Sequence, residues 1–165
     1  ENLGETVAAA KVYDGHCVYR IDGADFARLD AIIDPVHYLD RLTMPKLVLL
    51  GGTDAFFAPD STRSWWGQLP SPKSFFMDGG CGHSGFVQSF KDVATSFIAG
   101  TVHKKAMPMI KWNISAATGD ITVRQVSDHT PLSVVVWWAD SPTGRTRDFR
   151  EVSYSDQGLA AQPGP

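Results

Sequence analysis

Two side chains stand where an acid and a base could act together. Asp54 follows the short apolar run Leu47–Leu50 and its two glycines, and His83 follows the next apolar run, Ser74–Met77. If both runs are parallel strands, their carboxyl ends meet at one edge of a sheet, where open α/β folds carry their active sites. An acid followed by a histidine is also the second half of the Ser-Asp-His order of α/β hydrolases. In that chemistry the acid orients the imidazole, which accepts a proton from a serine.

Each of these residues also has an ordinary structural interpretation. An aspartate after two glycines commonly serves as a turn or cap residue, and a histidine commonly lies at a helix entry. Asp78 is a second acid near His83, and we keep it as an alternative partner. Asp60 fits a helix N-cap better than a catalytic acid. The hypothesis of paired chemistry therefore depends on the fold bringing Asp54 and His83 together.

A nucleophile for such a triad is not evident in the sequence. No G-x-S-x-G elbow occurs, and Ser84, although flanked by His83 and Gly85, lacks the preceding strand that an elbow requires. The chain also has no phosphate-binding glycine loop, no dinucleotide fingerprint and no His or Cys residues at metal-ligand spacing. We therefore expect no cofactor and no metal, and we expect this chain alone to be inactive.

The elements that would position these residues alternate between helix and strand. Helical spacing predicts helices over Ala24–Ile33, over a short segment capped by Asp34, over Asp60–Leu69 and over Phe86–Gly100. The two apolar runs between them are typical of strands buried on both faces. This alternation predicts an α/β fold, with a parallel sheet and crossover helices.

The pattern changes after Gly100. Apolar and polar residues alternate over Met109–Ser115, Ile121–Val126 and Leu132–Ala139, and a fourth strand is predicted at Arg147–Val152. We divide the chain into an α/β portion at residues 1–102, a small antiparallel β unit at 108–153 and a tail at 154–165 that we expect to be disordered. The tryptophans are expected to fill the core rather than bind a ligand: Trp65, Trp66, Trp112, Trp137 and Trp138.

Composition narrows the classes of partner. The 165 residues include 18 acidic and 15 basic side chains, a net charge of -3. Without a basic run, nothing in the charge pattern favours nucleic-acid binding. No apolar stretch is long enough to span a membrane. Cys17 and Cys81 permit one disulfide, and the start at Glu1 without a signal segment predicts a processed chain, an excised domain or a fragment.

Several blocks of the chain resemble the PhoPQ-activated pathogenicity-related family. Ile33–Leu47 is similar to its DPxxYxDRLTMPKL signature, and Gly52–Ser61 is similar to its GDEFFxPDSS block. Shorter similarities lie at Gly82–Ser84, Val136–Ala139 and Arg147–Arg150. The long first block and the distant RDFR block together make the resemblance specific.

The resemblance implies an α/β-hydrolase-like protein, mostly secreted or periplasmic, in which Asp54 is the triad acid and His83 the triad base. The substrate would be a small-molecule or peptide ester or amide. The family's serine lies in an SKRGW-type elbow upstream of this chain, so a missing N-terminal half or a partner chain would complete the sheet. The chain departs from the family at Ala55, where an acidic residue is usual, and at Gly80-Cys81, where an asparagine is common.

Three hypotheses of function remain open from the sequence. The first is the C-terminal half of a serine hydrolase, which supplies the acid and the histidine. The second is a secreted signalling or binding protein of the proliferation-repressor type, which uses the fold without catalysis. The third is a truncated product with no independent role. An upstream elbow serine separates the first two, and aggregation of the isolated chain would favour the third.

Overall fold

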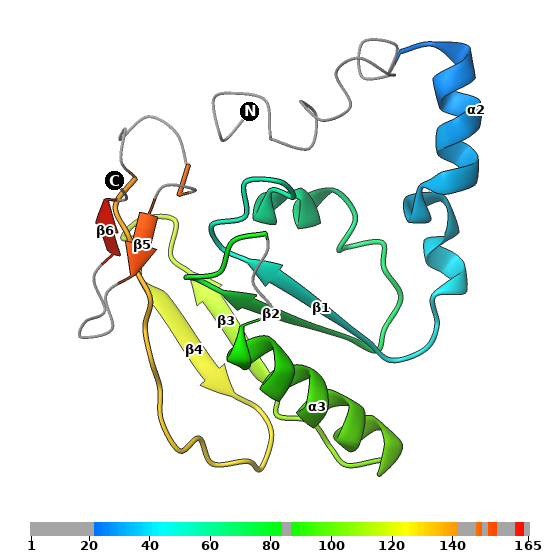
Figure 1. Ribbon diagram of the computed structural model, residues 1–165. Helices are drawn as coiled ribbons and strands as arrows, with labels where there is room; N and C mark the ends of the chain where they lie inside the picture. The colour runs from blue at the N-terminus through cyan, green and yellow to red at the C-terminus, as the bar shows by residue number, and fades with distance from the viewer. Residues whose placement is uncertain (1–21, 84–86, 142–147, 150–151, 155–160, 164–165) are drawn as a thin grey trace.

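The computed structural model describes residues 22–83, 87–141, 148–149, 152–154 and 161–163 (Figure 1). Helices and strands are mixed, with a small parallel sheet and small antiparallel pairs. The elements follow in the order α2 (Ala24–Ile33), the 3-10 helix η2 (Pro35–Arg41), β1 (Lys46–Gly51), the 3-10 helix η3 (Pro59–Ser64), β2 (Lys73–Asp78), α3 (Gln88–Val102), β3 (Ile110–Ile114), β4 (Ile121–Gln125), β5 (Val152–Tyr154) and β6 (Ala161–Pro163).

The strands β1 and β2 form the parallel pair that the apolar runs predict. Lys46 lies opposite Lys73, and the register continues to Gly51 opposite Asp78. Successive side chains of a strand point to opposite faces, and the neighbouring Phe75 and Phe76 have different partners. Phe76 meets Phe90 of α3 edge-on at 6.1 Å, whereas Phe75 meets Trp66, just after η3, at 5.7 Å. Both faces are covered in part, so β1 is half-buried along most of its length.

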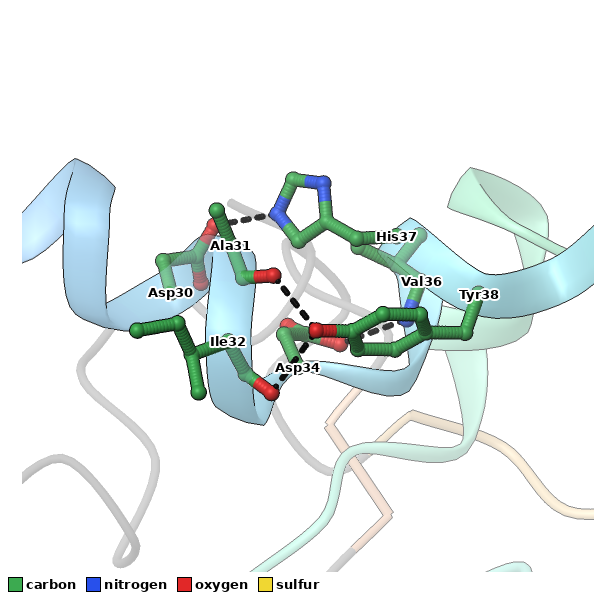
Figure 2. A network of polar contacts seen from close by, with 7 residues as sticks. All are labelled: Asp30, Ala31, Ile32, Asp34, Val36, His37 and Tyr38. Carbon is green, nitrogen blue, oxygen red and sulfur yellow. Dashed lines mark hydrogen bonds and ion pairs between the residues drawn. The ribbon is translucent and has the colours of Figure 1, made fainter.

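The joint between α2 and η2 is held by polar contacts within the first block that resembles the family (Figure 2). The Asp34 side chain accepts a hydrogen bond from Val36 N at 2.9 Å, which confirms the predicted cap. The Tyr38 hydroxyl lies 2.8 Å from Ala31 O and 3.0 Å from Ile32 O, two carbonyls in the last turn of α2. Since those carbonyls lack partners within the helix, the tyrosine ends α2 and orients η2.

Two helix predictions are corrected. The helix expected over Asp60–Leu69 is a 3-10 helix limited to Pro59–Ser64, and Ala58 is its N-cap. Because a proline suits the first helical position, Pro59 sets the start, and Asp60 lies in the first turn instead of capping it.

Gly100 does not end α3, which continues to Val102. Lys104 follows shortly after the helix and has a left-handed φ of 52°. This conformation is common just after a helix. A Cβ built on the buried Gly100 would lie 2.6 Å from Met107 Sδ. Gly100 therefore leaves room for the chain that returns after the helix.

The hairpin of β3 and β4 confirms the alternation predicted for its two strands. Ile110 lies opposite Gln125 and Ile114 opposite Ile121, with a turn that includes Gly119 at φ 76°. Glycine suits this turn because a left-handed φ strains residues that carry a Cβ. All residues of both strands are exposed.

The later strand predictions fare differently. Leu132–Ala139 is not a strand, and Trp138 alone forms an isolated bridge there. Alternating apolar and polar residues favour a strand, but a strand forms only where a neighbouring backbone pairs with it by hydrogen bonds. Much of the strand predicted at Arg147–Val152 lies outside the described residues, and β5 begins at Val152. The tail expected to be disordered carries β6, which pairs with β5.

Few side chains are buried in the part of the chain that the structure describes. They are Leu39, Leu69, Cys81 and Asp54. The prediction of core tryptophans is wrong for three residues, since Trp112, Trp137 and Trp138 are more than half exposed, whereas Trp65 and Trp66 are half-buried. Within the described ranges, no helix is both long and apolar enough to cross a membrane.

Backbone contacts extend the pairing of β1 and β2 beyond the strands. Gly52 N donates to Asp78 O at 2.7 Å, and Thr53 N donates to Cys81 O at 3.2 Å. We call these two contacts the strand-end seam. The fit is close, because a Cβ on Gly51 would lie only 2.2 Å from Cys81 O. The loop after β2 is thereby pressed against the end of β1.

Replacing Gly51 by alanine should open this seam. The new methyl group would collide with backbone, which has no rotamer to move away, and we expect the free energy of unfolding to fall by about 1–3 kcal/mol. Gly67→Ala is the matched control, because a Cβ there meets nothing within 4 Å. Denaturant unfolding of both variants measures the difference, and equal stabilities would contradict the close fit at Gly51.

Candidate active site

Asp54 is fixed in the loop that follows β1. Its backbone N donates to Gly51 O at 3.3 Å, so the chain turns sharply as it leaves the strand. The carboxylate oxygen Oδ1 accepts two hydrogen bonds from the next turn, from Phe56 N at 2.7 Å and from Phe57 N at 2.9 Å. The side chain is 9% exposed. These donors hold one carboxylate oxygen in place, so the other, Oδ2, faces away from the turn in a set direction.

His83 meets that second oxygen. Its Nδ1 lies 3.2 Å from Asp54 Oδ2, and the two residues come from the loops after β1 and β2. The ring stacks on Phe56 with centroids 4.5 Å apart and meets the edge of Phe57 at 5.1 Å. The side chain of His83 remains 45% exposed. An imidazole held at Nδ1 by an acid and packed between two rings presents Nε2 as its other proton-transfer atom.

Asp78, the alternative acid, is engaged elsewhere. Its Oδ1 accepts from Gly80 N at 3.0 Å and its Oδ2 accepts from the Ser89 hydroxyl at 2.5 Å. These contacts tie the end of β2 to the first turn of α3. The structure therefore brings Asp54, and not Asp78, to His83.

Another histidine–aspartate pair serves as a comparison for the contact between Asp54 and His83. Nε2 of His37 lies 2.7 Å from Asp30 Oδ2 (Figure 2). This pair joins α2 to η2, away from the strand ends, and its aspartate is 33% exposed. The Asp54–His83 pair differs by its buried acid, its backbone donors and its use of Nδ1.

Cys81 lies two residues before His83, and the sequence analysis noted it as a disulfide candidate and as a departure from the family pattern. Its side chain is almost fully buried, and Sγ donates to Gly82 O at 3.2 Å. Burial raises the pKa of the Cys81 thiol, and the negative charges of Asp78 and Asp54 raise it further. The thiol is therefore held in its neutral form, which is a poor nucleophile. Cys17 and Ser84 lie outside the described residues.

The pair can take part in proton transfer, because an acid at Nδ1 leaves Nε2 of the half-exposed imidazole as its other proton-transfer atom. Among the side chains that the structure describes, no group of three or more His, Cys, Asp or Glu residues could hold a metal ion.

The comparison with known proteins decides the family. Residues 4–150 match the family described as PhoPQ-activated pathogenicity-related protein. The chain belongs to this family. The resemblance drawn from the sequence blocks is thereby confirmed.

The chain is also similar to Autocrine proliferation repressor protein A of Dictyostelium discoideum. It is 28% identical over 164 residues, which cover 93% of this chain and 33% of the relative. The chain thus spans about a third of that relative's length. No solved structure shows significant similarity to the chain.

The backbone donors at Asp54 allow a sharp test of the imidazole's orientation. In Asp54→Asn, Phe56 N and Phe57 N still require an oxygen at Oδ1, so the amide nitrogen would face His83. An amide N–H needs an acceptor, and we expect the proton to move from Nδ1 to Nε2. Imidazole ¹⁵N chemical shifts measure the tautomer. Asp78→Asn is the control and should leave it unchanged, whereas an Nδ1-protonated ring in Asp54→Asn would contradict the contact.

The raised pKa of Cys81 predicts a loss of stability at alkaline pH. The unfolded thiol ionises at a lower pH than the folded one, so the unfolded state binds fewer protons above about pH 8.5. With reductant present, the free energy of unfolding of the wild type should fall more steeply with rising pH than that of Cys81→Ala. At neutral pH the two curves should run parallel. Parallel curves throughout the alkaline range would contradict the prediction.

Proposed function

We propose that this chain supplies the acid and the base of a Ser-His-Asp triad in an α/β-hydrolase-like protein that cleaves esters or amides. In this proposal residues 1–102 are the C-terminal portion of the hydrolase domain, and residues 108–153 are a small antiparallel β unit beside it. The β1–β2 pair is the portion of the sheet that carries the last two triad members. The helices between and after these strands belong to the same portion of the domain.

The observation that carries the proposal is the contact of His83 Nδ1 with Asp54 Oδ2 at 3.2 Å, at the carboxyl ends of two parallel strands. A triad needs the acid at Nδ1, because Nε2 must face the nucleophile. Asp54 is nearly buried and fixed by two backbone donors, so it holds its direction without rearrangement. The exposed His37–Asp30 pair has none of these features except the short distance.

In the proposed reaction a serine hydroxyl attacks the carbonyl carbon of the substrate while Nε2 of His83 takes its proton. The imidazolium then gives that proton to the leaving alcohol or amine, and a water repeats the sequence to release the acid. Asp54 keeps the proton on Nδ1 and stabilises the imidazolium as it forms. Phe56 and Phe57 restrict the ring's rotation by packing against it.

The nucleophile and the remaining strands come from outside this chain in the proposal. The chain spans about a third of its named relative, and a preceding segment or a partner chain would supply the serine. The apolar face of the β3–β4 hairpin is exposed within the described residues, and the missing portion is a natural cover for it. The substrate would be a small-molecule or peptide ester or amide.

A second candidate function is signalling without catalysis by a secreted protein. The observation that favours it is the relative, which is named an autocrine proliferation repressor. A hydrolase-like fold can serve as a binding scaffold, because function depends on the site rather than on the fold. A secreted or periplasmic location belongs to both candidates.

The full-length protein with His83→Ala should lose most of its turnover of an activated ester such as 4-nitrophenyl acetate. Removal of the general base should lower kcat by about 10²–10⁴-fold. His37→Ala is the matched control: it removes a histidine that also pairs with an aspartate, 2.7 Å away, and it should leave kcat unchanged.

Unchanged turnover in the folded His83→Ala protein would overturn the hydrolase proposal. If the same variant restrains cell proliferation as well as the wild type does, the result would favour the signalling function. Loss of turnover in both histidine variants would indicate general damage to the fold, and thermal unfolding of each variant identifies that case.

A further inference from the structure

An apolar cavity lies against the edge of the sheet where β1 and β2 end. Its volume is about 300 Å³. One wall comes from the strand ends, with Gly52, Met77 and Gly79. The opposite wall comes from the segment after the hairpin, with Trp137, Trp138, Ala139 and Phe149. Two parts of the chain that are far apart in sequence therefore line one hollow that is open to solvent.

The floor of this cavity is the strand-end seam. Gly52 N donates to Asp78 O at 2.7 Å, and a Cβ on Gly52 would lie 3.0 Å from Gly79 Cα. Glycines at both positions let the two loops approach closely without side chains that would fill the space above them. Gly52 precedes Asp54 by two residues, and Gly79 precedes His83 by four. The floor is thus continuous with the loops that carry the acid and the base.

The chemistry of the lining selects the ligand class. Among the described residues that line it, none is ionisable, and three are large aromatic rings. Trp137 and Trp138 are 55% and 52% exposed, so a large apolar surface there remains open to contact. Aromatic side chains gain most from covering by another flat apolar group. These described side chains offer a charged ligand no counter-charge, whereas they would desolvate a neutral hydrocarbon group favourably.

We propose that this cavity binds a neutral aromatic or bulky hydrocarbon group of the substrate. A protein cavity of about 150 Å³ lined by apolar side chains accommodates benzene, and this cavity has about twice that volume. It fits a group of two fused rings or a branched chain. As a substrate subsite this rests on the proposed hydrolytic function, and it assigns a role to the Trp137–Ala139 segment that the triad does not use.

The binding test uses the full-length protein and a neutral probe, 2-naphthylmethanol, measured by calorimetry. Trp138→Ala removes an aromatic wall and Ala139→Phe fills the space, and each should raise Kd about 3- to 10-fold. Trp112→Ala is the matched control, because it removes another exposed tryptophan, from β3, and it should leave Kd unchanged. Ala139→Phe serves as the second variant if Trp138→Ala fails to fold.

Binding and hydrolysis are then separated. Repeating the calorimetry with His83→Ala should give the wild-type Kd, because the ligand group does not depend on the proton transfer. If the proposed function also holds, 2-naphthylmethanol should inhibit ester hydrolysis competitively in the wild type and less in Ala139→Phe. Binding without any His83-dependent hydrolysis would sink the hydrolase proposal and leave a hydrocarbon-binding site.

Absence of saturable binding would overturn the cavity proposal. So would an equal weakening by Trp138→Ala, Ala139→Phe and Trp112→Ala, because it would indicate non-specific adsorption to exposed apolar surface. Hydrolysis that depends on His83 but is indifferent to the probe would keep the triad and reject the subsite.

Discussion

The strand-end seam is the constraint on which the functional region depends. Parallel pairing brings β1 and β2 into register, but pairing alone stops at Gly51 and Asp78. The contacts of Gly52 N with Asp78 O and of Thr53 N with Cys81 O continue the alignment into the loops. Because these bonds join backbone to backbone, they set the spacing of the loops, and the glycines at Gly51 and Gly52 leave room for that close approach. The Asp54–His83 contact and the apolar cavity both lie on this seam.

Competition among hydrogen-bond partners selects which acid meets the histidine. Asp54 and Asp78 both lie near the strand ends, but Asp78 is occupied by Gly80 N and the Ser89 hydroxyl. Asp54 has one oxygen held by backbone donors and the other directed at His83. The burial of Cys81 raises the pKa of its thiol, and the carboxylates of Asp78 and Asp54 raise it further. The two loops thus carry a neutral thiol as well as an oriented imidazole.

The blocks that relate the chain to its family differ in their physical roles. Asp34 and Tyr38, in the first block, cap helix ends and fix the joint between α2 and η2. The second block contains Asp54 and the two phenylalanines that pack against His83. The Trp137–Ala139 segment forms a wall of the cavity. A family signature therefore contains both residues that hold the fold and residues that fit a site.

The sequence by itself determined where several helices and strands lie, because their residue patterns favour one type of secondary structure. The helical spacing of Ala24–Ile33, the cap at Asp34, the two apolar strands and the alternating hairpin all follow from propensity and periodicity. The positions of Asp54 and His83 after successive strands also placed them at one edge of the sheet. Tertiary structure decided what local patterns do not encode. Leu132–Ala139 alternates but forms only an isolated bridge at Trp138, and three tryptophans stay exposed. Gly100, inside α3, leaves room for Met107. The choice of Asp54 over Asp78 likewise depends on tertiary structure, because Ser89 of α3 engages Asp78. His83 meets Asp54 across 29 residues of chain, a contact that spacing along the sequence does not specify.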